Sequence, residues 1–190
     1  ILAMPGSTID DFYKEMDYIW NFQAFGSYRH DYMFLPDSRL NSQEYKIKYD
    51  IRTVEVYTDI ADEQGIDSWN NLYKNKKSYF KTISSCFSFT IEEMHEMWFM
   101  NSAGNYLLQH FYPMFENSIS PSVFTKKAYK AISKLDEWDD IHSEIRDIFN
   151  PNSQPKSIKV LNQEFRANTI NKFIEKNRHI IMSEVSKECL

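Results

Sequence analysis

The sequence predicts a predominantly helical α+β protein with one small sheet in its N-terminal half. Apolar residues recur at helical spacing through most of residues 91–190, which predicts a helical C-terminal half. The apolar–polar alternation typical of strands is confined to residues 44–58. Apolar residues make up 42% of the chain and aromatic residues 16%, which is enough to bury a core and argues against disorder. We therefore expect a sheet formed from about residues 32–58 and 84–90, with helices packed against it.

The first predicted element is a helix that begins after Thr8. A threonine can cap a helix, and the two aspartates that follow suit the positive end of the helix dipole. The helix is expected to run to about residue 25, where a Gly-Ser pair ends it. Residues 32–35 follow as a candidate short strand, and Pro36 disfavours the helical conformation for the residue before it.

The alternating segment that follows changes phase once. Its apolar residues first occupy odd-numbered positions and then even-numbered ones. The odd positions are Tyr45, Ile47, Tyr49 and Ile51, and the even positions are Val54 and Val56. A β-bulge or a sharp reversal between two strands would produce such a slip. We favour two strands, at about residues 44–49 and 53–58.

A second helix is expected after Asp67, a residue that can cap it. The apolar face of this helix is Trp69, Leu72, Tyr73, Phe80 and Ile83. Residues 86–89 follow as a candidate short strand, which would complete the sheet.

The helical half opens with a long helix over residues 91–112. Thr90 and Glu93 have the spacing of a capping box at its start. Methionine and aromatic residues surround Trp98 on nearly every side of this helix. That pattern favours a buried central helix, and an adaptable binding surface is the alternative.

Three further helices follow the long one. The first begins at Ser120-Pro121, which suits an N-cap and a first helical position. The other two have apolar residues at helical spacing, which are Trp138, Ile141, Ile145, Ile148 and Phe149, then Leu161, Phe165, Phe173, Ile174, Ile181 and Val185. Residues 150–155 form the clearest linker. We expect an α/β part at residues 1–90 and a helical lobe at 91–190, or both within one domain.

Composition limits the function classes. The formal net charge of −5 provides no overall attraction for nucleic acid, so such a partner would need a local basic patch or a bound metal. Two cysteines form neither a disulfide framework nor a zinc pattern, which fits a reducing compartment. No apolar run approaches 18 residues, so we expect no membrane span and a cytoplasmic location.

One segment has the residue types of a metal-dependent nuclease. Carboxylates that converge on Mg²⁺ or Mn²⁺ activate water, and a nearby lysine stabilises charge on the phosphate. On a strand, Glu44 and Lys46 would share a face. Pro36-Asp37 followed by Glu44-x-Lys46 resembles the signature of the PD-(D/E)xK nuclease superfamily. The alternative is that the charged residues of 44–50 form the solvent-facing side of an ordinary strand.

A displaced match pairs Asp37 with Glu55, in the middle of the second predicted strand. This version is similar to the cap-snatching endonucleases of segmented negative-strand RNA viruses, in which the lysine comes from the following helix. The resemblance implies Lys74 and Lys77 as catalytic lysines and His30, within an Arg-His-Asp, as a metal ligand. It implies a Mg- or Mn-dependent nuclease that acts on nucleic-acid phosphodiesters.

Two further motifs share one spacing. Glu92-x-x-His95 and Asp139-x-x-His142 have the E-x-x-H pattern of di-iron bundles, although ordinary charged helix starts would look the same. A second function class also remains open. A mainly helical, non-enzymatic protein-interaction module would explain the chain with a protein partner and no cofactor.

Overall fold

The structure is a computed structural model that describes residues 4–24, 33–34, 39–59, 77–157 and 166–187. Its strands are β1 (Met33–Phe34), β2 (Arg52–Asp59), β3 (Lys77–Ser85) and β4 (Lys156–Ser157). Its α-helices are α1 (Ile9–Asn21), α2 (Gln43–Lys48), α5 (Ile91–His110), α6 (Pro121–Ile132), α7 (Trp138–Phe149), α9 (Asn171–Lys176) and α10 (Arg178–Lys187). Short 3-10 or π turns lie at Arg39–Asn41, Tyr112–Met114 and Arg166–Ile170. The predicted class, predominantly helical with a small sheet and a helical C-terminal half, is confirmed.

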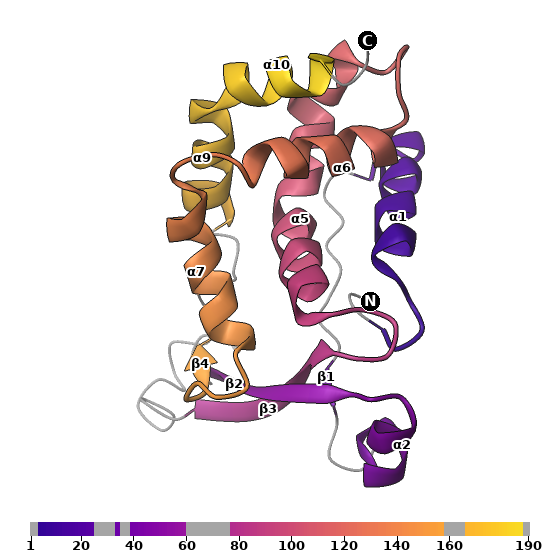
Figure 1. Cartoon of the computed structure of the whole chain (residues 1–190), viewed down its shortest axis with the longest axis vertical. Coiled ribbons are helices and arrows are strands. Elements are labelled where there is room, and N and C mark those ends of the chain that lie inside the picture. The colour runs from indigo at the N-terminus through magenta and orange to yellow at the C-terminus, as the bar shows by residue number, and fades with distance from the viewer. Residues whose placement is uncertain (1–3, 25–32, 35–38, 60–76, 158–165, 188–190) are drawn as a thin grey trace, which may run out of the picture.

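Helix α5 stands in the middle of the helical part, with the other long helices around it (Figure 1). Its capping box is formed as predicted, because the Thr90 hydroxyl accepts from the Glu93 amide at 3.2 Å and the Glu93 carboxylate accepts from the Thr90 amide at 2.7 Å. Trp98 is 1% exposed, and buried residues occur on every side of the helix. The sequence prediction of a central core helix is therefore confirmed.

A glycine sets the distance between α1 and α5. A Cβ atom at Gly104 would lie 2.9 Å from Cε of Met16, so the missing side chain makes room for the methionine. Thr8 caps α1 as predicted, and its hydroxyl accepts from the Asp11 amide at 3.2 Å. The helix ends at Asn21, earlier than expected, and Gln23 adopts a left-handed φ of 54° just beyond it.

The sheet is built on the antiparallel pair β2–β3, to which the two-residue strands β1 and β4 add. The strand order is β1-β3-β2-β4, and β4 runs parallel to β2. Val54, Val56 and Thr82 are buried on one side, whereas Glu55 and Lys81 are exposed. The sheet lies across the N-terminal end of α5, so one face meets the core and the other faces solvent (Figure 1).

The strand predicted at residues 44–49 is wrong, because this segment forms helix α2. The Ser42 hydroxyl accepts from the Tyr45 amide at 3.2 Å, and an acid in the first turn with lysines in the last turn suits the dipole. The helix closes where Asp50 takes a left-handed φ of 46° and the Ile51 amide donates to the Lys46 carbonyl at 2.8 Å. The change of phase in the sequence is therefore a helix end and not a turn between strands.

The second predicted helix is also wrong in its C-terminal part. Residues 60–76 lie outside the described residues, but Phe80 and Ile83 lie in β3. Pairing with β2 along the whole strand decides the conformation of this segment. The strand expected at 86–89 is reduced to one isolated bridge between Cys86 and Phe89.

The remaining helices mostly follow their sequence signals. Ser120 caps α6, Pro121 is its first residue, and α7 buries the predicted apolar face. The last helix, predicted as continuous, is divided at Asn177, whose side-chain amide donates to the Phe173 carbonyl at 3.0 Å. Leu161 and Phe165 lie outside the described residues.

One apolar cluster joins the two parts of the chain. It contains buried residues of α1 and of the sheet together with those of α5, α6, α7, α9 and α10. Among the helices that the structure describes, none has the length and apolar character needed to span a membrane.

Replacing Trp98 tests the central role of α5. Trp98→Ala should lower the free energy of unfolding by about 3–5 kcal/mol, because a large, fully buried ring would leave a cavity. Urea denaturation measures the change. Tyr18→Ala, at a residue of α1 that is 64% exposed, is the control and should change stability by less than about 0.5 kcal/mol. A change near zero at Trp98 would support an exposed binding patch.

Candidate functional site on the outer face of the sheet

Four of the seven predicted site residues lie in described parts of the chain. Glu55 is in β2, Lys77 begins β3, and Glu44 and Lys46 are in α2. The other three, His30, Asp37 and Lys74, lie outside the described residues. The site can therefore be built around β2, β3 and α2.

Glu55 lies at the middle of β2 with an exposed side chain, because its neighbours Val54 and Val56 turn toward the core. The residue directly opposite on β3 is Lys81, which is also exposed. In the nuclease signature the lysine stands two positions after the acid, and here that position is Tyr57. A cross-strand neighbour lies about as close as a same-strand neighbour, so Lys81 supplies a lysine beside the acid.

Sequence reasoning missed Lys81 because residues 77–83 were assigned to a helix. Residues 79–83 are rich in aromatic and β-branched residues, and this composition was the signal that could have revealed a strand. The helical interpretation also misplaced Lys77. This residue lies on β3, opposite Asp59.

A row of tyrosines lies beside the Glu55–Lys81 pair. Tyr57 and Tyr79 are cross-strand partners, and their ring centroids are 5.7 Å apart. The Lys77 ammonium lies 3.8 Å from the centroid of the Tyr57 ring, a close cation–π contact. Tyr79 is 54% exposed, so much of its ring is open to solvent.

Helix α2 adds Lys46 to this region. The Lys46 ammonium donates to Oδ1 of Asn41 at 2.6 Å. Burial, and then the positive charge of Lys81, lower the pKa of Lys46. We use the term outer sheet face for the six residues Lys46, Glu55, Tyr57, Lys77, Tyr79 and Lys81.

The outer sheet face lies in a basic part of an acidic chain. Residues 39–59 and 77–85 contain six lysine and arginine residues and four acids, whereas the whole chain carries a net charge of −5. The remaining residues therefore carry a net charge of −7. A polyanion would meet this face more favourably than the rest of the molecule.

The structure does not contain the strand on which Glu44 and Lys46 would share a face in the Pro36-Asp37 and Glu44-x-Lys46 motif. Glu44 and Lys46 belong to a helix, in which residues two positions apart point in different directions. Glu44 lies in the first turn of α2, where its charge suits the dipole. Within the described ranges, no three His, Cys, Asp or Glu side chains gather to hold a metal ion. A metal at Glu55 would therefore need ligands from outside these ranges.

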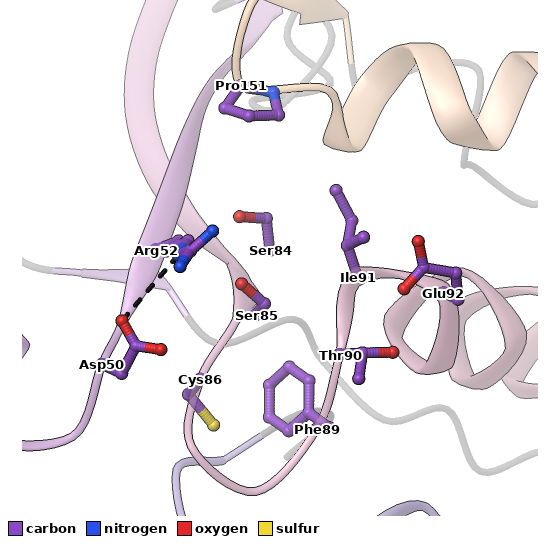
Figure 2. A pocket seen from close by; sticks show the side chains of 10 residues that line it. All are labelled: Asp50, Arg52, Ser84, Ser85, Cys86, Phe89, Thr90, Ile91, Glu92 and Pro151. Atoms are coloured by element: carbon purple, nitrogen blue, oxygen red, sulfur yellow. Dashed lines mark ion pairs between the residues drawn. The ribbon is translucent and has the colours of Figure 1, made fainter.

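A cleft of about 340 Å³ lies elsewhere, between the start of β2, the end of β3 and the N-terminus of α5 (Figure 2). Its lining residues are Asp50, Arg52, Ser84, Ser85, Cys86, Phe89, Thr90, Ile91, Glu92 and Pro151. Arg52 pairs with Asp50 at 3.8 Å. Hydrogen bonds from its own amide and from Thr90 lower the pKa of Glu92, so this carboxylate already uses the helix N-terminus. These charges of both signs favour no single class of ligand.

The two predicted E-x-x-H-type motifs do come together, but through their histidines alone. The His95 and His142 rings are 5.4 Å apart between α5 and α7. Glu92 is exposed, and the Asp139 side chain is 84% exposed and lies 3.8 Å from Arg146. The arrangement lacks the inward-pointing carboxylates of a di-iron site.

Comparison with known proteins adds no identification. The sequence matches no protein-family model, and no curated protein matches it. The resemblance to the nuclease superfamily therefore rests on the residues quoted above.

A charge exchange tests the geometry of the Glu55–Lys81 pair. Lys81→Glu places like charges directly opposite each other and should lower the free energy of unfolding by about 0.2–1 kcal/mol. Adding Glu55→Lys restores opposite charges and should recover the loss, as measured by urea denaturation. A double variant no more stable than Lys81→Glu would show that the two side chains do not interact.

Proposed function

We propose that the outer sheet face binds single-stranded nucleic acid. The observation that carries the proposal is that Lys77, Lys81 and two tyrosines lie on one solvent-facing side of the sheet, while helix α2, which precedes β2, adds Lys46. Proteins that bind single strands combine a positively charged surface with aromatic rings on which bases stack.

The lysines would contact phosphates. The positive charge of Lys81 contributes to the lowered pKa of Lys46, and a phosphate bound beside these lysines would relieve that repulsion. Glu55 offsets the charge of Lys81 in part, but residues 39–59 and 77–85 together still contain two more basic than acidic residues. Such contacts release counterions and make binding dependent on salt.

The tyrosines favour a single strand over a duplex. Tyr79 is half exposed beside Tyr57, whose ring also holds the Lys77 ammonium. A base can stack on an exposed tyrosine only when it is free of its own duplex neighbours. Stacking on a tyrosine tolerates any base, and the six residues of the face include no helix that could enter a duplex groove. Binding with little sequence preference is therefore expected.

A Mg- or Mn-dependent nuclease is the second candidate function, favoured by the exposed carboxylate of Glu55 opposite Lys81. In this hypothesis Glu55 would hold the metal together with Asp37 and His30, and the metal would supply an activated water. Lys81, with Lys77 or Lys74, would stabilise charge on the phosphate. The hypothesis depends on ligands outside the described residues, so it requires more than the binding proposal does.

Substitutions on the face test binding. Tyr79→Ala should weaken binding of a fluorescent oligothymidine or oligouridine by about 1–3 kcal/mol, roughly 5- to 150-fold in Kd, through lost stacking. Lys81→Ala should weaken it and reduce the slope of log K against log salt by about 0.7. Fluorescence anisotropy measures both. Tyr18→Ala in α1 and Lys134→Ala in the turn after α6, both at exposed residues, are matched controls and should bind like wild type.

Manganese separates binding from catalysis. If Glu55 holds a cation, Mn²⁺ should stabilise the folded protein by about 2.7 kcal/mol at a hundredfold excess over its Kd, because it binds only the folded state. Thermal unfolding with and without Mn²⁺ measures this, and Glu55→Ala should abolish the shift and any strand cleavage. Glu44→Ala is the control and should retain both.

The outcomes distinguish the function classes. Binding without a manganese shift or cleavage would support a non-enzymatic nucleic-acid-binding protein. Cleavage that requires Mn²⁺ and Glu55 would support the nuclease. Wild-type protein that neither binds nor cleaves single strands would contradict both and favour the helical protein-interaction module.

A further inference from the structure

The contact between α5 and α7 contains two histidines in an apolar setting. The His95 and His142 rings meet edge to face, with centroids 5.4 Å apart and planes at 77°. His142 also stacks on Trp138 at 4.8 Å, and His95 lies 6.0 Å from the Phe149 ring. His95 is 6% exposed. The pair is therefore part of the packing that holds α7 against α5.

The hydrogen-bonding state of the pair favours neutral rings. Nε2 of His95 and Nε2 of His142 are both buried, and neither has a hydrogen-bond partner among the described residues. A protonated imidazole donates from both nitrogens and carries a full charge. Protonation in place would bury an unpaired N–H and would set two positive charges side by side.

The charged groups around the pair do not offset this cost. From α7, Arg146 adds positive charge near both rings, and Asp139 faces His142. From α5, Glu92 faces His95, but its carboxylate is exposed and bonded at the helix N-terminus. Burial first, then His142, hold the pKa of His95 down to about 4. Burial first, then Arg146, also lower the pKa of His142.

We infer that the His95–His142 contact is an acid-sensitive latch that holds α7 on α5 at neutral pH and releases it in acid. Released imidazoles have an ordinary pKa of about 6.5 and take up protons below that pH, whereas the packed rings resist protonation. Acid therefore favours the released state. The contact keeps its full strength above about pH 6.5 and weakens as the pH falls toward the pKa values of the packed rings.

Release would have a defined structural effect. Trp98 of α5 and Phe149 of α7 pack together at 6.0 Å, so separation of the helices would expose both rings. Pro151, just after α7, lines the cleft opposite Ile91 of α5 (Figure 2). Movement of α7 would therefore open the cleft at this side. A fall in pH would therefore make the cleft at the N-terminus of α5 more accessible to a ligand.

Hydrogen exchange of the whole chain between pH 7.5 and 4.5 tests the latch. After correction for intrinsic exchange, opening of α7 amides should rise about tenfold per pH unit below 6.5 if one ring takes up a proton, and up to a hundredfold if both do. Amides of α1, which packs on α5 and α6, serve as the internal reference. His95→Phe and His142→Phe keep an aromatic ring without titration, so each single variant should weaken the dependence and the double variant should abolish it. His179→Phe, at an exposed histidine, should retain it.

A second measurement applies even if the phenylalanine variants fail to fold. Imidazole C–H signals of wild-type protein should show His95 protonating at about pH 4 and His142 protonating below the ordinary value of about 6.5. Titration of both rings near that value, or equal pH dependence in the wild type and the two variants, would overturn the latch.

Discussion

Complete burial of α5 is the constraint on which the rest of the structure depends. A helix of 20 residues with buried side chains on every side has to be covered by apolar surface from all directions. Helices α1, α6, α7 and α9 supply most of that cover, and the sheet closes the end where α5 begins. Each large side chain buried in this way contributes about 1.5–3 kcal/mol, so positions such as Trp98 and Phe99 dominate the stability of the fold. The same enclosure leaves little water around His95. Protonation of this buried ring is therefore unfavourable, and the packing around it depends on pH.

Local signals made most helices predictable, and non-local pairing made part of the sheet unpredictable. Thr8, Thr90 and Ser120 each form the cap that their sequence context indicates, because capping involves residues within one turn. Residues 44–49 were misread because Tyr45, Ile47 and Tyr49 alternate like a strand, although Ile47 is 72% exposed and covers no core. Residues 77–83 were misread in the opposite sense. Their conformation depends on pairing with β2, about 25 residues earlier. Apolar residues at helical spacing within the segment carry no information about that distant partner.

The candidate site was accessible to sequence reasoning only in part. Glu55 could be placed on an exposed strand position, because the flanking valines define which face is buried. Lys81 could not be placed beside it, since the register of two strands is a tertiary property. The histidine motifs illustrate the same limit. Their common spacing was visible in the sequence, but only the packing of α7 on α5 shows that the rings, and not the acids, meet. A pattern that suggested a metal centre thus became a contact between two neutral side chains.

The parallel pairing of β4 with β2 has a consequence for synthesis on the ribosome. Val56 pairs with Lys156, one hundred positions later in the chain, so this edge of β2 receives its partner only after most of the protein has been made. Until then the nascent chain exposes the backbone of a strand whose partner does not yet exist, and such edges attract other chains. Closing a loop of this length also slows folding, because contacts distant in sequence form late. Helices α1, α5 and α6 can assemble earlier, which gives the emerging chain a folded scaffold before its sheet is complete.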